Sequence, residues 1–181
     1  MQIAFWGIAR QIGTSANMAA VAAGLAQYAQ IPDSFVLKEC GSGQWEEETI
    51  KSCQLLVVNI SIPHQGMENI YLKHLPVHKN IIFLVGKYHQ NQFDELKSLV
   101  RQYRIDISGV CTIPYNMRFQ KAYENRTVFT YVRNFEKTAK SCEDFLFERS
   151  LKHTVKKILH YETTPQECVM LGCPTGRNLQ Q

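Results

Sequence analysis

The sequence predicts an α/β fold in which a parallel five-stranded sheet has helices on both faces. Five short apolar runs lack the alternation of a half-exposed strand, which is typical of strands covered on both sides. Helical patterns lie between these runs, and such alternation favours parallel strands joined by right-handed crossovers. The predicted strands are Gln2–Trp6, Ser34–Lys38, Gln54–Ile60, Asn80–Val85 and Ile107–Ile113.

The helices are predicted from apolar residues at helical spacing. Thr14–Ala29 places Val21 and Leu25 on one face, as a helix packed on a sheet requires. After the fifth strand the pattern is helical, so we expect a helical C-terminal segment. The remaining helices are predicted at Gln92–Tyr103, Arg118–Asn125, Val128–Phe135, Ala139–His160 and Pro165–Leu171.

Length and composition predict one main domain over residues 1–162, followed by a short C-terminal helix and tail over 163–181. The formal net charge of +4 is only mildly basic, which makes nucleic acid an unfavoured partner. The six cysteines show no CxxC spacing and are interpreted as reduced thiols. Because no signal peptide or bilayer-length apolar run is present, we expect a cytoplasmic protein without a membrane span.

An incomplete phosphate-binding loop, WGIARQIGTSANM, joins the first strand to the first helix. The usual pattern is G-x-x-x-x-G-K-[ST], in which backbone N–H groups and a helix N-terminus hold phosphate. Anchored on Gly13, the pattern has Ile8 for the first glycine and Thr14 for the lysine, whereas Ser15 matches the hydroxyl residue. The loop therefore keeps N–H groups for phosphate but loses the charge. The alternative is a plain strand–turn–helix junction whose helix is capped by Thr14 or Ser15.

The charged groups that ATP hydrolysis needs are not evident. No predicted strand end carries a carboxylate to organise Mg²⁺, so no catalytic residue is assigned, and Ser15 is the only candidate ligand if Mg²⁺ binds. The histidine spacing does not favour zinc. Arg10 restores the charge if its side chain turns inward to a phosphate; if it points outward, it is an exposed loop arginine.

Four stretches together resemble one known family. AFWG…GTSANM, LLVVNIS, KNIIFLVGKY and TIPYNMRFQKAYENRTV are similar to the ParA/MinD family of deviant Walker ATPases, and most closely to TadZ-like pilus-assembly proteins of bacteria. The resemblance covers about residues 1–160. It implies a degenerate P-loop NTPase-like domain in a cytoplasmic protein. It further implies dimerisation around ATP and a role in positioning cargo, such as partition or pilus-assembly machinery.

The resemblance also implies site residues. The phosphate loop falls at Ala9–Ser15, with the family's two lysines at Ala9 and Thr14. The position of the family's base-recognising asparagine falls close to Lys87. The full set of candidate nucleotide- or anion-binding residues is Arg10, Gln11, Gly13, Thr14, Ser15, Asn59, Pro114, Tyr115 and Asn116.

A shortening near ECGSGQ is the largest departure from the family, whose Walker B strand and aspartate lie in the segment that is missing here. Without that strand, Ser34–Lys38 can pair directly with Gln2–Trp6. The expected strand order becomes 2-1-3-4-5, as in flavodoxin, with a ligand crevice where the loop at Gly7–Ser15 meets Asn59–Pro63.

We therefore expect a non-hydrolysing MinD/TadZ-like scaffold or positioning module that pairs with another protein or with itself and requires no cofactor. One alternative is a switch that binds ATP or ADP through the residual loop. A second alternative is a flavodoxin-like small-ligand binder. FMN is disfavoured for it, because Trp6 and Tyr115 are the only ring-stacking candidates near the crevice.

Overall fold

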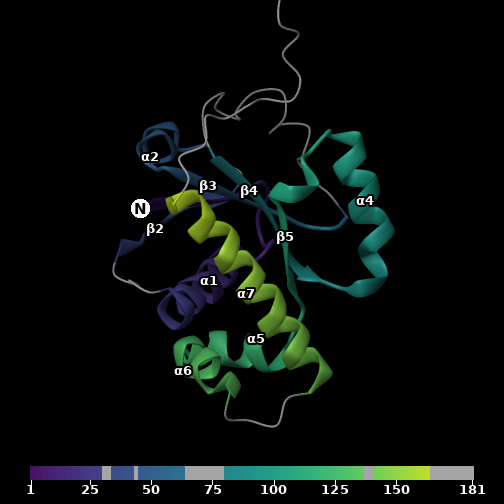
Figure 1. The fold of residues 1–181 in the computed structure, drawn as a ribbon. Helices are drawn as coiled ribbons and strands as arrows, with labels where there is room; N and C mark the ends of the chain where they lie inside the picture. The colour runs from purple at the N-terminus through teal and green to yellow at the C-terminus, as the bar shows by residue number, and fades with distance from the viewer. Residues whose placement is uncertain (30–33, 43–44, 64–79, 137–140, 164–181) are drawn as a thin grey trace, which may run out of the picture.

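The computed structural model describes residues 1–29, 34–42, 45–63, 80–136 and 141–163. Strands and helices alternate through most of the chain (Figure 1). The strands are β1 (Gln2–Gly7), β2 (Val36–Ser42), β3 (Leu55–Ile60), β4 (Asn80–Tyr88) and β5 (Val110–Pro114). The helices are α1 (Thr14–Tyr28), α2 (Glu47–Ser52), α4 (Phe93–Gln102), α5 (Met117–Glu124), α6 (Val128–Arg133) and α7 (Cys142–Thr163).

The five strands form one parallel sheet in the order β2-β1-β3-β4-β5, which confirms the predicted fold class and strand order. In the centre, Phe5 of β1 pairs with Val57 of β3, and Val57 pairs with Ile82 of β4. Every residue of β3 is buried, as expected for a strand covered on both faces. The order reverses between β1 and β3, and the loops at this switch point form a crevice in folds of this class.

Three strands differ by more than one residue from their predicted ranges. The fourth continues through Lys87 to Tyr88 rather than ending at Val85. The second strand runs over Val36–Ser42 rather than Ser34–Lys38. The fifth begins at Val110, because 107–109 form a short 3₁₀ turn whose start is fixed by the Asp106 side chain, which accepts from Ser108 N–H. The shift in the second strand is important, because it brings Glu39 and Ser42 into the strand next to β1.

Helices cover both faces of the sheet (Figure 1). On one face, α1, α5, α6 and α7 pack over alternate strand residues such as Phe5, Leu55 and Ile113. On the other, α2 and α4 cover the opposite set, including Trp6 and Val58. These two apolar layers hold the sheet between them, and they fix the strand ends that build the cavity described below.

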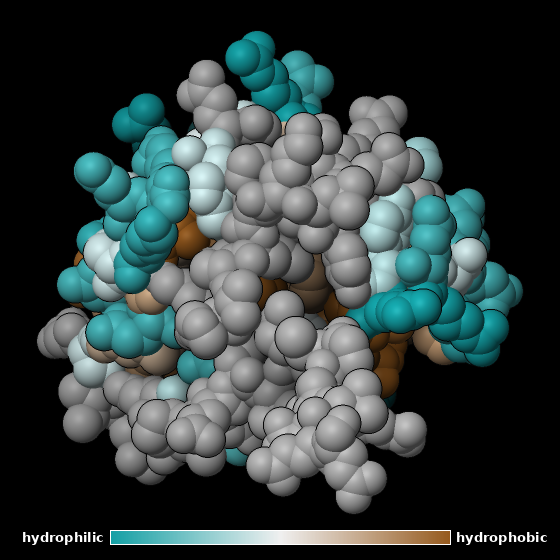
Figure 2. All heavy atoms as spheres, turned by 90° about the horizontal axis from the view of Figure 1, so that it is seen from above, coloured by the Kyte–Doolittle hydropathy of each residue, from teal (hydrophilic) through white to brown (hydrophobic). Residues whose placement is uncertain are grey.

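The helix α4 shows how one stripe of a helix enters the core. Leu96 and Leu99 are buried against the sheet, whereas Asp94 and Lys97 are exposed. Figure 2, a view from above, shows described hydrophilic side chains projecting on both flanks of the molecule, with some hydrophobic ones visible beneath and beside them. This is the distribution expected of amphipathic elements around a core.

The C-terminal segment is helical, as predicted. In α7, Leu151 and Val155 pack against α1 at Gly24, where a Cβ atom would lie 2.9 Å from Val155 Cγ2. The predicted start of this helix at Ala139 and the predicted helix at Pro165–Leu171 lie outside the described residues. None of the helices in the described ranges combines the length and apolar character needed to cross a bilayer.

Candidate functional site

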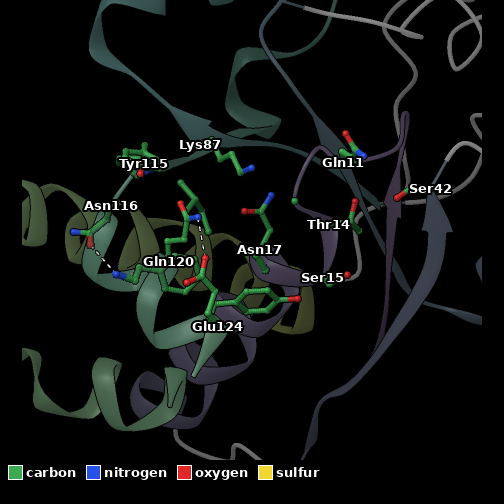
Figure 3. A pocket seen from close by; sticks show the side chains of 16 residues that line it. Gln11, Thr14, Ser15, Asn17, Ser42, Lys87, Tyr115, Asn116, Gln120 and Glu124 are labelled. Carbon is green, nitrogen blue, oxygen red and sulfur yellow. Dashed lines mark hydrogen bonds between the residues drawn. The ribbon is translucent and has the colours of Figure 1, made fainter. Parts of the chain in front are cut away.

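A cavity of about 350 Å³ opens at the carboxyl edge of the sheet (Figure 3). The loop before α1, the ends of β2, β4 and β5, and one side of α5 form its walls. Open parallel sheets bind ligands at this edge, but the predicted position of the crevice is wrong in part, because Asn59–Pro63 do not line the cavity, which extends from the loop before α1 toward β4 and β5. The lining residues are Gln11, Gly13–Asn17, Ser42, Lys87, Ile113–Asn116, Phe119, Gln120, Tyr123 and Glu124.

The N-terminus of α1 faces this cavity. Gly13 caps the helix with φ of 86°, a left-handed conformation that glycine adopts without steric cost. No side chain caps the helix and its first turn contains no acidic residue, so the capping role expected for Thr14 or Ser15 is wrong. The first-turn N–H groups have no partner within the helix and lie at its positive end, an arrangement that suits an anion.

Lys87 supplies a positive charge beside that helix end. The β4–β5 register shifts between Val85 and Tyr88, and Lys87 lies in this irregularity with φ of 51°. Such irregularities redirect a side chain away from the regular pleat. A Cβ atom on Gly13 would lie 3.8 Å from Lys87 Cε, and Figure 3 shows the lysine reaching over the cavity from its strand. A strand far along the sequence therefore provides a cation at the cavity, which the loop's own Arg10 does not line.

A buried hydroxyl of α1 also lines the cavity. Thr14 is only 4% exposed, and its Oγ1 atom has no hydrogen-bond partner among the described residues. An unpaired buried hydroxyl costs about 1–3 kcal/mol relative to a satisfied one. The Oγ1 atom lies beside Gly7, near the Ser42 hydroxyl at the end of β2.

Asn59 has a supporting position rather than the predicted ligand-facing one. It is fully buried and does not line the cavity. Its Oδ1 atom accepts a 2.9 Å hydrogen bond from Asn17 Nδ2, and its own amide donates to Trp6 O at 3.3 Å. Gly86 leaves room for this pair, because a Cβ atom there would lie 2.4 Å from Asn17 Nδ2. Asn59 thus holds Asn17, which does line the cavity.

Asn116 lines the cavity, but hydrogen bonds within the protein use its polar atoms. Its Oδ1 atom caps α5 by accepting from Phe119 N at 2.8 Å, and it lies 3.2 Å from the Tyr131 hydroxyl. Its Nδ2 atom donates to Asp144 at 3.0 Å, so a side chain predicted to bind a nucleotide or anion instead joins α5 to α7. Pro114 and Tyr115, predicted beside it, do line the cavity.

The carboxylate Asp144 is the centre of this buried network. Besides Asn116, Tyr131 donates to it at 3.0 Å and Arg118 pairs with it at 2.7 Å. Burial alone would raise the pKa of Asp144, but hydrogen bonds from Asn116, Tyr131 and Ser141 and the Arg118 charge lower this pKa below its ordinary value. Burial, followed by the neighbouring Asp144, raises the pKa of Tyr131. The network fixes the start of α7 against the cavity wall.

A carboxylate within β2 contacts the loop, although none lies at a strand end, so the prediction about the strand ends is not contradicted. Because β2 continues to Ser42, Glu39 belongs to the strand beside β1, and Ser15 Oγ donates to Glu39 Oε1 at 2.5 Å. Glu39 is exposed and does not line the cavity. Ser15 itself lines the cavity, as do Gln11, Gly13 and Thr14 of the predicted loop.

Arg10 is exposed and outside the cavity, so the inward orientation considered for it is wrong. Lys87, unlike Arg10, lines the cavity. Asn17, Gln120 and Glu124 also line the cavity, and no sequence motif predicts a binding role for them. For Lys87, the sequence offers one indication of a site, because a glycine precedes this cation near the end of a predicted strand.

Trp6 is 3% exposed and packs edge-on against Trp45, with 5.0 Å between ring centroids. It does not line the cavity, which leaves Tyr115 as the one of the two predicted ring-stacking candidates that does.

No protein-family model matches the chain, and no curated protein is significantly similar to it. The similarity to the ParA/MinD family therefore rests on the quoted sequence stretches alone.

Proposed function

We propose that this chain is a nucleotide-binding module that holds its ligand without hydrolysing it. The phosphate groups lie against the N-terminus of α1 and are neutralised by Lys87. The position of Lys87 Cε over Gly13 is the observation on which the proposal depends. Backbone N–H groups, a helix dipole and one lysine are the elements of a phosphate site, even though the lysine here comes from β4.

The lining and volume of the cavity also support the proposal that a nucleotide binds there. Gln11 and Lys87, both non-glycine residues with positive φ, lie at the phosphate end. Strained backbone of this kind is concentrated at functional sites. Tyr115 and Tyr123 line the cavity and are 39% and 37% exposed, so flat apolar surface is available for a base. The volume is within the range of small-molecule sites.

Hydrolysis is not part of the proposal. Attack of water on a phosphate needs a group that orients the water and a metal that neutralises charge. Glu124 is the only acidic side chain among the described residues that line the cavity, and no histidine lines it. Glu39 is held by Ser15 outside the cavity. Occupancy, not turnover, would set the state of such a module.

Binding of a ligand in the cavity would affect the position of α7. Pro114, Tyr115 and Asn116 lie on the cavity wall, and Asn116 is bonded to Asp144 of α7. A switch or scaffold that presents α5 and α7 to a protein partner fits this connection. Pilus-assembly or partition machinery is the partner that the family resemblance suggests, and a cytoplasmic location would accompany it.

The unfolding free energy with and without ligand tests the proposal. ATP, ADP, GTP and GDP are compared with adenosine, guanosine and inorganic phosphate. A nucleotide at roughly 100-fold over its Kd should stabilise the protein by about 2.7 kcal/mol. The nucleosides should stabilise it far less, because they lack the group that Lys87 and α1 recognise.

Two results would contradict the proposal. The first is the absence of stabilisation by every nucleotide, which would favour a scaffold whose cavity stays empty. The second is release of inorganic phosphate from ATP or GTP that is abolished in Ser15→Ala, because it would show an active hydrolase.

A further inference from the structure

A second polar group in the cavity has no use in binding phosphate. Gln120 and Glu124 are one turn apart on α5, and Gln120 Nε2 donates to Glu124 Oε1 at 3.0 Å (Figure 3). The i,i+4 spacing puts both on the same face of the helix. A carboxylate repels phosphate, so its presence among the lining residues points to a different part of the ligand, one that donates hydrogen bonds.

The pair offers a defined hydrogen-bonding pattern. Gln120 Nε2 has a second N–H to donate, and the Glu124 carboxylate accepts only. Together they present a donor beside two acceptor oxygens. The pairing edge of guanine presents the complement, since its O6 accepts while N1–H and the N2 amino group donate. Adenine presents one amino donor and an unprotonated N1. Both this N1 and the carboxylate are hydrogen-bond acceptors, so they repel each other.

Aromatic rings at the same part of the cavity can hold a flat base. Tyr123 lies between Gln120 and Glu124 in the sequence and lines the cavity with them. Tyr115 lines it from the end of β5, and its ring is supported by His89 at 5.4 Å with 27° between planes. A ring fixed in this way offers a stacking surface to any base. Choice among bases must therefore come from Gln120 and Glu124.

We propose that the cavity prefers guanine nucleotides, and that Glu124 is the residue that determines this specificity. The inference rests on the proposed function, because the base can reach α5 only if the phosphate groups occupy the site at α1 and Lys87. The Glu124 carboxylate accepts from N1–H and the N2 amino group, and Gln120 donates to O6.

Calorimetric titration with GDP, ADP, IDP and 2′-deoxy-GDP tests this assignment. GDP should bind at least about tenfold more tightly than ADP, because the adenine edge leaves the carboxylate without its two donors. IDP lacks the N2 amino group and should bind with intermediate affinity. 2′-Deoxy-GDP should match GDP within about threefold, because Glu124 recognises the base and not the ribose.

Two variants complete the experiment. Glu124→Gln should weaken GDP by about tenfold while changing ADP by less than about threefold, which removes the preference. Glu95→Gln, an exposed carboxylate change on α4, is the matched control and should leave both affinities unchanged.

Equal or tighter binding of ADP overturns the base assignment, as does an equal loss for GDP and ADP in Glu124→Gln. Weakened 2′-deoxy-GDP would assign Glu124 to the ribose instead, which also overturns it. Absence of binding by all four nucleotides overturns the proposed function itself. Nucleotide binding that depends on Lys87 but ignores the base overturns only the guanine preference.

Discussion

The hydroxyl of Thr14 lies directly over Gly7, so that a Cβ atom on Gly7 would be 2.4 Å from Thr14 Oγ1. The same Cβ atom would be 2.7 Å from Ser42 Oγ. The glycine at the end of β1 therefore allows hydroxyls from α1 and β2 to approach the strand backbone. Thr14 Oγ1 is buried and has no partner in the described residues, so it lowers the free energy of unfolding. A ligand that supplied a hydrogen bond to this hydroxyl would recover that free energy.

We predict that Thr14→Val makes the ligand-free protein more stable by about 1 kcal/mol and weakens nucleotide binding by about tenfold. Valine keeps the shape and removes the unsatisfied hydroxyl. Urea denaturation and calorimetry measure the two effects. Thr154→Val is the control, because Thr154 Oγ1 is buried but donates to Ser150 O at 3.0 Å, and its loss should destabilise the protein. A Thr14→Val protein that is less stable and binds nucleotide normally would refute this role.

Gly86→Ala should destabilise the protein by about 2 kcal/mol, because the new Cβ atom meets the Asn17 amide, which is held by Asn59 and cannot retreat freely. Chemical denaturation measures the change. Gly109→Ala is a matched control, since its Cβ atom would lie 3.4 Å from Ile81 O, an ordinary contact. Equal effects of the two substitutions would mean that the approach at Gly86 is unimportant.

Asp144→Asn should destabilise the protein by about 2 kcal/mol at pH 7, because the donors from Asn116 and Tyr131 lose a charged acceptor. The folded-state pKa of Asp144 is below its ordinary value of 3.8. Its stabilising contribution is therefore complete above that value and is lost as pH falls through the folded-state pKa. The difference between wild type and variant should accordingly shrink from pH 7 to pH 3.

The control for this pH series is Glu143→Gln, an exposed change in the same turn of α7. Its effect should stay within about 0.5 kcal/mol throughout. A wild type–Asp144→Asn difference that is constant with pH would show that the charge of Asp144 contributes nothing.

Removal of divalent metal should change nucleotide affinity by less than about threefold, because N–H groups and a lysine need no metal to hold phosphate. The described residues contain no group of three His, Cys, Asp or Glu side chains suited to a metal ion. Titrations in EDTA and in excess Mg²⁺ measure the effect. Binding only with Mg²⁺ would instead assign Ser15 and Glu39, 2.5 Å apart, to a metal site.

The fold could be predicted because its signals are local. The apolar run of β3 and the periodic stripe of α4 are visible within short windows of sequence. Strand ends were less predictable. The sequence around Glu39–Ser42 has the composition of a loop, but pairing with β1 extends β2 through it, so Glu39 was missed as a neighbour of Ser15.

The site was predictable only where it is continuous in sequence. Gln11, Gly13, Thr14 and Ser15 were found because they form one loop before one helix. Lys87 was not assigned a role, because its position depends on an irregularity in β4 that only sheet pairing creates. Similarly, the composition of the loop after β5 cannot show that Asn116 faces Asp144, since the two meet only when α7 packs beside α5.

Calorimetric titration of wild type and Lys87→Gln with GDP and ADP, in the absence of metal, tests the phosphate site most directly. Lys97→Gln, an exposed lysine change on α4, is the control. We predict saturable one-to-one binding to wild type and to the control, and binding weaker by at least about tenfold in Lys87→Gln. Identical affinities in wild type and Lys87→Gln, or no binding of either nucleotide to wild type, would contradict the account.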